Sequence, residues 1–263
     1  MISNEDIYAN KIFLNAVLPL VKVVVEEKKD LSKKFHGKNV KIQISAKDID
    51  NNRKVGTHFA IEDGIWNVVK GTAENPDVEL EFKSIPALNS FFAGKSKKLP
   101  KIKGFTKLGL LVNTLKALTT MANLLGSTNI PKEDDEKELL VKLYFYLLSS
   151  GISQLNKAGH PSVSKWAKRS PDRVYAWAVN EKSELSAYIR VKAGNTKAVR
   201  GEYKRSKPFF TMRFNNVDSA LGTLLEIDDM VDATVNGRLI MEGAPEFGAQ
   251  LGEFMLLVGS YAK

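Results

Sequence analysis

The sequence predicts an α+β protein built from two successive units, each a mainly antiparallel sheet covered on one face by helices. Short segments in which apolar and polar residues alternate indicate half-buried strands, and longer segments with apolar residues three or four apart indicate covering helices. The same order of segments returns about 130 residues later in the 263-residue chain. A domain usually has about 100–150 residues, so the length fits two domains.

The first unit begins with a predicted helix and continues with four predicted strands. The helix covers residues 7–25. Residues 40–47 alternate apolar and polar side chains throughout, which predicts a strand with one buried face. Further strands are expected at residues 55–61, 65–70 and 77–83. Asp63 and Gly64 lie between the second and third strands and are typical of a tight hairpin.

The fourth strand indicates which face of the sheet is covered. Apolar Val78, Leu80 and Phe82 alternate with charged residues that begin with Glu79. Such alternation is typical of an antiparallel sheet with one face in water and the other on the core. We therefore expect Glu79 on the wet face and helices over the opposite face.

Two helices are predicted after the sheet. The first covers residues 85–92 and is ended by Gly94, and the second covers residues 108–125. Between them lies a short extended piece, residues 99–103, which is closed by Gly104.

The second unit repeats this order, with little identity between the two copies. A helix with acidic residues in its first turn is expected after Pro131. It is followed by strands at 173–179, 185–192, 197–203 and 210–214, a short helix at 217–227, an extended piece at 234–242 closed by Gly243, and a last helix from Pro245. Gly, Ser and Pro in residues 126–131 mark a break, so the predicted domains are residues 1–130 and 131–263.

Composition narrows the class of protein. With 43% hydrophobic and 26% charged residues, the chain is in the range of folded globular domains. It contains no cysteine, which excludes disulfides and thiolate chemistry and suits the cytoplasm, the expected location. Polar residues interrupt both long apolar stretches, residues 12–25 and 105–125, so neither a signal peptide nor a membrane-spanning helix is predicted.

The formal net charge of +9 leaves several partners open. The lysines are spread along the chain, so a solvated basic face is the simplest interpretation. Their local concentration between Lys95 and Lys107 allows transient contact with an anionic membrane surface. Nucleic-acid binding is not expected, because the aromatic residues fall mostly on inward faces rather than between exposed basic residues. The sequence does not define an oligomeric state.

No catalytic pattern is found in the sequence. His36, His58 and His160 are isolated and lack metal-ligand spacing. Phosphate-binding glycine loops and nucleophile-elbow motifs are absent. We therefore predict a protein that is not an enzyme and that uses no metal or cofactor.

The first unit carries a set of short motifs in a fixed order. They are an Asp-Gly turn before Trp66, the strand DVELEF at residues 77–82, FFAGK at residues 91–95 and IKG at residues 102–104. This order resembles the sterol carrier protein 2 family of lipid-transfer domains. In the second unit the resemblance depends on PFFTMRF at 208–214, GRLIMEG at 237–243 and the closing helix. The second unit departs from the pattern at the hairpin, where Asn195 and Lys197 stand near the Asp-Gly-x-Trp position.

The resemblance implies two tandem lipid-binding units, each with a five-stranded sheet and helices that enclose an apolar tunnel. It implies non-enzymatic binding and transfer of a fatty acid, acyl-CoA, sterol-like molecule or other lipid. Apolar stripes of this kind also fill ordinary cores, and inward-facing methionines in the second unit favour an adaptable pocket. The alternative is an accessory protein that presents a hydrophobic intermediate, such as a quinone precursor, to partner enzymes.

The predicted ligand-binding residues are the inward-facing apolar residues of the strands and covering helices. In the first unit they are Val78, Leu80, Phe82, Leu88, Phe92, Leu108, Leu111, Leu115 and Leu118. In the second unit they are Phe210, Met212, Phe214, Leu224, Met241, Phe247, Leu251, Phe254 and Met255. The expected partner is a lipid or another apolar small molecule.

Overall fold

The computed structural model describes residues 1–262 and contains two compact units. One unit comprises Met1–Ala122 together with the end of the chain from Ser260, and the other comprises Asn123–Gly259. The segment 126–131, which the sequence marks as a break, falls at the start of the second unit.

The first unit contains five α-helices and five strands within the described residues. The helices are α1 (Asn4–Ile12), α2 (Leu20–Glu27), α3 (Lys29–Ser32), α4 (Ile85–Phe92) and α5 (Leu108–Leu125), and the strands are β1 (Val40–Asp48), β2 (Arg53–Glu62), β3 (Ile65–Lys70), β4 (Val78–Phe82) and β5 (Lys101–Lys103). A π-helical turn, Phe13–Val17, joins α1 to α2 just before Pro19, which lacks the N–H that an undisturbed α-helix needs. A 3₁₀ turn, Phe105–Lys107, leads into α5.

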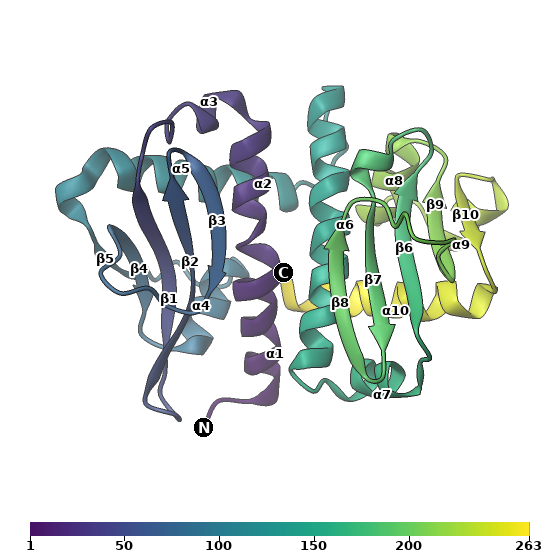
Figure 1. Cartoon of the computed structure of the whole chain (residues 1–263), viewed down its shortest axis with the longest axis horizontal. Coiled ribbons are helices and arrows are strands. Elements are labelled where there is room, and N and C mark those ends of the chain that lie inside the picture. The colour runs from purple at the N-terminus through teal and green to yellow at the C-terminus, as the bar shows by residue number, and fades with distance from the viewer. Residues whose placement is uncertain (263) are drawn as a thin grey trace. The chain divides into compact units, whose positions relative to one another are not determined.

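The first sheet has the strand order β3-β2-β1-β4-β5 (Figure 1). β1 and β4 are parallel, and the other neighbours are antiparallel. The hairpin between β2 and β3 turns at Asp63 and Gly64, with φ of 48° and 80°. Two consecutive positive φ angles are typical of the hairpin turn that an Asp-Gly pair favours, so this prediction is confirmed.

The second unit also contains five helices and five strands within residues 1–262. The helices are α6 (Asp134–Lys157), α7 (Pro161–Arg169), α8 (Val217–Leu224), α9 (Met230–Val235) and α10 (Pro245–Ala262), and the strands are β6 (Arg173–Val179), β7 (Ala187–Lys192), β8 (Asn195–Arg200), β9 (Phe210–Phe214) and β10 (Leu239–Glu242).

The second sheet repeats the topology of the first. Its order is β8-β7-β6-β9-β10, with β6 and β9 parallel and the other neighbours antiparallel (Figure 1). Ala193 and Gly194 turn the β7–β8 hairpin with φ of 49° and 77°. The prediction of an α+β chain with two five-stranded, mainly antiparallel sheets is therefore confirmed.

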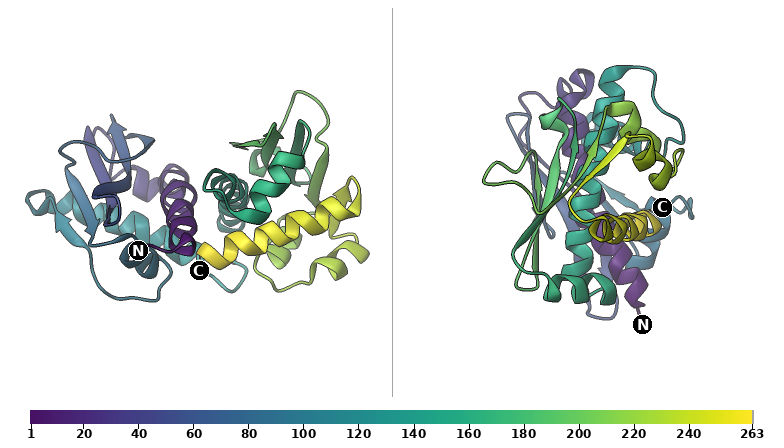
Figure 2. Two further views of the ribbon diagram at one scale, coloured as in Figure 1. Left: turned by 90° about the horizontal axis from the view of Figure 1, so that it is seen from below. Right: turned by 90° about the vertical axis from the view of Figure 1, so that its right-hand side faces the viewer.

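Helices cover one face of each sheet. In the second unit the strands form one layer, and α9 and α10 lie on one side of it (Figure 2). α6 packs against β7 and β8 on that unit's sheet. In the first unit α2 contacts β3, and α4 contacts β1 and β4. Ile42, Ile44 and Ala46 of β1 are completely buried.

The connection from β3 to β4 covers part of the opposite face of the first sheet. The strand order requires residues 71–77 to cross β2 and β1, and the backbone N–H of Ala73 donates to Gln43 Oε1 at 2.6 Å. Glu79, which the alternation placed on a wet face, is only 2% exposed. That expectation was wrong, because alternation within a strand does not reveal a segment that crosses above it.

Two elements of the second unit differ from the prediction. The extended piece expected over 234–242 is extended only in β10, and the chain before it forms the helix α9. The Asp229 side chain caps α9 by accepting hydrogen bonds from the N–H groups of Val231 and Asp232. The helix α7 was not predicted, although Val163, Trp166 and Ala167 form its buried face at helical spacing.

Helix α5 buries a different face from the one predicted. Leu108 and Leu115 are 61% and 40% exposed, so their assignment as inward-facing residues was wrong. The buried face consists of Leu110, Leu111, Thr114, Ala117, Leu118 and Met121. Apolar residues occupy more of this helix than one packed face requires, and spacing alone could not identify the buried part.

Within residues 1–262, two helical stretches have the length and apolar composition needed to cross a membrane. They are Asn4–Glu27, of which 67% of the most apolar window is buried, and Phe105–Leu125, of which 39% is buried. The first packs in the core of its unit, whereas the second leaves a large apolar surface uncovered.

Candidate functional site

Most of the predicted ligand-binding residues lie in packed cores. The buried ones are Val78, Leu80, Phe82, Leu88, Leu111, Leu118, Phe210, Met212, Phe214, Leu224, Leu251, Phe254 and Met255, while Phe92, Met241 and Phe247 are partly exposed. Phe82 lines a cavity in the first unit, and Phe247 and Phe254 line a cavity in the second. Ligand contact at the remaining positions stays a prediction.

The second-unit cavity lies among α7, the start of β6 and α10, and has a volume of about 440 Å³. Ligand pockets are usually about 300–1,000 Å³, so the space suits a small organic molecule. Four aromatic side chains contribute to its walls: Trp166 from α7, Tyr175 from β6, and Phe247 and Phe254 from α10. We refer to it as the aromatic cavity.

The aromatic walls pack against one another in edge contacts. The ring of Trp166 lies 5.3 Å from that of Tyr175 and 5.2 Å from that of Phe254, measured between centroids. Phe209, from the segment before β9, extends the cluster and lies 4.8 Å from Phe247. Such rings give a fixed apolar surface with little rotamer entropy to lose on binding.

A buried polar atom belongs to this cavity. Tyr175 is 2% exposed, and its hydroxyl has no hydrogen-bond partner within residues 1–262. A buried hydroxyl without a partner destabilises a protein by about 1–3 kcal/mol. The hydroxyl is therefore an unsatisfied polar group in the wall of the cavity rather than an exposed contact point.

The charged side chains that line the cavity are mainly cationic. Lys165, Arg169 and Arg173 line it together with one carboxylate, Glu253. The Arg173 guanidinium lies over the ring of Phe209 at 3.8 Å from the centroid, which holds this cation at the edge of the apolar walls. An apolar interior with a positive rim can hold an apolar chain inside and a carboxylate or phosphate at the entrance.

Replacing Tyr175 by phenylalanine tests the state of its hydroxyl. We expect the ligand-free Tyr175→Phe variant to be more stable by about 1 kcal/mol, because an unpaired buried polar atom is removed while the ring stays. Urea unfolding of delipidated protein measures this difference. Equal or lower stability of the variant would mean that the hydroxyl is already satisfied.

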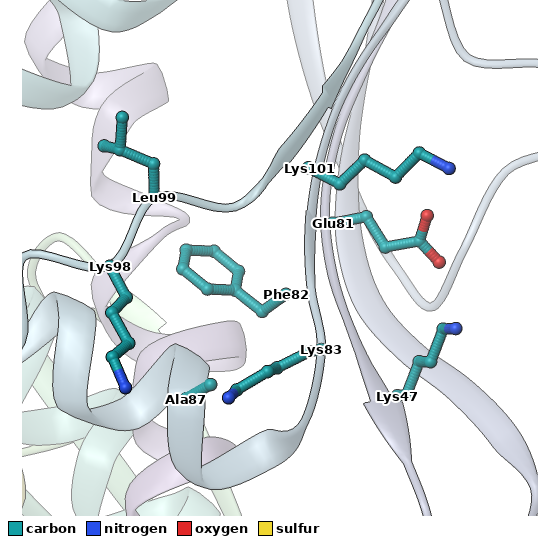
Figure 3. A pocket seen from close by; sticks show the side chains of 8 residues that line it. All are labelled: Lys47, Glu81, Phe82, Lys83, Ala87, Lys98, Leu99 and Lys101. Carbon is teal, nitrogen blue, oxygen red and sulfur yellow. The ribbon is translucent and has the colours of Figure 1, made fainter.

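A second cavity, in the first unit, has a volume of about 330 Å³ and a basic lining (Figure 3). Phe82, Ala87 and Leu99 form its apolar part. Lys47, Lys83, Lys98 and Lys101 also line it, together with Glu81, and no ion pair involves these four lysines within the described residues. Its walls contain one aromatic side chain, so the aromatic cavity is the better candidate for a lipid chain.

An ion cluster lies on the face of the first sheet opposite the helices. Glu79 accepts hydrogen bonds from Gln43 and Ser45 of β1, at 2.7 Å and 2.6 Å, and from Lys54 of β2 and Lys103 of β5, at 2.9 Å and 2.7 Å. Burial alone would raise the pKa of Glu79, but these hydrogen bonds outweigh it and lower the pKa to about 2. The ionised carboxylate of Glu79 on β4 therefore links four strands, because its partners lie on β1, β2 and β5.

The sequence identified only part of the aromatic cavity. Phe247 and Phe254 were predicted from the stripe on the last helix, but Trp166, Tyr175 and Arg173 were not. Pro161 followed by buried residues three and four apart could have revealed α7 and its tryptophan. The proximity of β6 to α7 and α10 is tertiary and has no local signal.

Comparisons with known proteins give structural matches alone. No family model matches the sequence, and no curated protein matches it. A crystal structure of sterol carrier protein 2 matches with 14% sequence identity and a TM-score of 0.29. The match covers 44% of this chain and 92% of that chain. Sterol carrier protein 2 is thus among its structural neighbours.

Two further solved structures show similar levels of likeness. One is a conserved hypothetical protein of Thermus thermophilus, described as possibly a sterol carrier protein. It matches with 16% sequence identity and a TM-score of 0.30, and the match covers 52% of this chain and 93% of that chain. A stereoselective inverting sec-alkylsulfatase from Pseudomonas matches with 12% identity, 57% of this chain and a TM-score of 0.26, but only 28% of the sulfatase is covered.

Proposed function

We propose that the chain binds an amphipathic organic anion, such as a fatty acid, in the aromatic cavity and acts as a non-enzymatic lipid carrier. The observation that carries the proposal is a cavity of about 440 Å³ that is lined by four aromatic side chains and by three cationic ones, Lys165, Arg169 and Arg173. The apolar chain would lie against Trp166 and Phe254, and the anionic group would meet Arg173.

Burial of the chain would supply most of the affinity. About ten methylene groups at about 0.8 kcal/mol each give about 8 kcal/mol, which corresponds to micromolar binding. The charged rim would add selectivity for an anionic head group, because a buried charge-assisted hydrogen bond is stronger than a neutral one.

Binding of laurate and of its neutral analogue dodecanol to the delipidated full chain tests this function. We expect micromolar binding of both, and we expect Arg173→Gln to raise the Kd of laurate about tenfold while leaving the Kd of dodecanol nearly unchanged. Isothermal titration calorimetry measures both constants. Arg205→Gln is the matched control, because Arg205 lies in an exposed segment outside the cavity and should leave both constants unchanged.

Native mass spectrometry of the protein as purified gives an independent measurement. A retained lipid that is lost on organic extraction supports the carrier function. A chain that carries no lipid, binds neither probe and instead co-purifies with an enzyme contradicts it and favours the accessory role.

A further inference from the structure

Helix α5 presents an apolar face to solvent. Phe105, Leu108, Val112 and Leu115 are 60%, 61%, 59% and 40% exposed. Their separations of three, four and three residues place them on one side of the helix and of the turn that leads into it. We call these four residues the α5 apolar face. Monomeric proteins rarely leave such a continuous apolar stripe uncovered without a partner.

The other side of α5 belongs to the core of the first unit. Leu111, Ala117, Leu118 and Met121 are buried there. A helix that crosses a bilayer needs apolar contact around its whole circumference, whereas α5 keeps one side on its own unit. Half-burial is typical of a helix that lies in the plane of an interface.

The chain around this face is basic and free of acids. Residues 82–132 contain nine lysines and no Asp or Glu. Lys103 and Lys107 form ion pairs with acids of β4 and the segment before it. No ion pair involves Lys97, Lys98 or Lys116 within residues 1–262. These lysines are exposed, and Leu99 among them is 77% exposed.

We propose that the α5 apolar face docks on an anionic bilayer, with its apolar side chains in the interfacial region and the neighbouring lysines on lipid phosphates and carboxylates. Lys116 lies on α5 itself, and Lys97 and Lys98 lie next to the exposed Leu99 in the segment before β5. Each lysine near an anionic membrane surface contributes about 1 kcal/mol to binding. This attraction adds to the binding free energy from burying the α5 apolar face. Docking here does not depend on a ligand in the aromatic cavity.

Charge favours a bilayer over a second copy of the chain. Two copies that met through the α5 apolar face would bring two acid-free lysine segments together, and like charges repel. An anionic surface is attracted by the same lysines.

Flotation of the full chain with phosphatidylcholine vesicles, with and without phosphatidylserine, tests this docking. We expect binding to vesicles that contain phosphatidylserine, and a fall in binding as salt rises. The double variant Leu108→Ser, Val112→Ser should lower the partition coefficient about tenfold or more, because the exposed parts of both side chains would lose their contact with the bilayer. Lys97→Gln with Lys98→Gln should weaken binding to the anionic vesicles alone.

The matched control is Ile49→Ser with Ile65→Ser, which removes two exposed apolar side chains of the first unit outside the α5 apolar face. Its partition coefficient should equal that of the unaltered chain. Urea unfolding of all variants verifies that they are equally folded. Unchanged vesicle binding of the Leu108, Val112 variant overturns the proposal. A concentration-dependent dimer that this variant abolishes, without vesicle binding of the unaltered chain, overturns it in favour of self-association.

Discussion

Glu79→Gln should lower the free energy of unfolding by about 3 kcal/mol at neutral pH. The glutamine keeps the shape of the side chain but removes the charge that lies 2.9 Å from Lys54 and 2.7 Å from Lys103, and it leaves Glu81 as the remaining acid of both lysines. Urea unfolding across pH measures the loss. Because the folded-state pKa of about 2 lies below the usual 4.5, the stabilisation is present above about pH 4.5 and is lost as the pH falls toward 2.

The free energies of unfolding of the unaltered chain and of the Glu79→Gln variant should therefore become nearly equal near pH 2. Glu62→Gln, at an exposed position of the same unit, is the control and should change the free energy of unfolding by less than about 0.5 kcal/mol. If the Glu79→Gln variant had the same stability and pH dependence as the unaltered chain, the ionised Glu79 would not contribute to the free energy of unfolding.

Gly104→Ala should destabilise the first unit by about 3–5 kcal/mol. Gly104 stands between β5 and the turn into α5 with a φ of 96°, and an added Cβ would overlap the carbonyl oxygen of Asp77. That carbonyl cannot move easily, because Asp77 leads into β4 and its N–H donates to the Lys41 carbonyl at 2.8 Å. Thermal or urea unfolding measures the effect.

Gly94→Ala separates the effect of the overlap from that of backbone conformation. Gly94 also has a positive φ, 69°, but no atom lies within 4 Å of the position that its Cβ would take. We expect this variant to lose about 1 kcal/mol. Equal losses at the two glycines would show that the Asp77 carbonyl moves aside at little cost.

Local patterns in the sequence predicted the strands of the sheets better than they predicted the segments and helix faces that pack on the sheets. Alternation identified β1 and β4, and the Asp63-Gly64 pair identified a hairpin, because both signals depend on neighbouring residues. Burial of Glu79 and exposure of Leu108 depend instead on segments that are remote in sequence. Neither a crossing connection nor the choice of one helix face leaves a periodic signal.

The candidate site follows the same division. The stripe on α10 predicted Phe247 and Phe254, which do line the aromatic cavity. The unpaired Tyr175 hydroxyl and the cations Arg173, Lys165 and Arg169 come from β6 and α7. The packing of these two elements near α10 is a property of the tertiary structure. Methionines, which the sequence favoured as pocket residues, lie elsewhere: Met212 is completely buried in the core.

The parallel pairing of β1 with β4 also predicts an order of folding for the first sheet. β1, β2 and β3 are joined by short turns, whereas β4 reaches β1 only after residues 71–77 have crossed the sheet, so that Gln43 and Glu79 meet 36 positions apart. Loop-closure entropy therefore favours the meander first and the arrival of β4 later. Contacts that form late chiefly slow unfolding, so the Glu79 cluster contributes to the lifetime of the folded unit more than to the speed at which it forms.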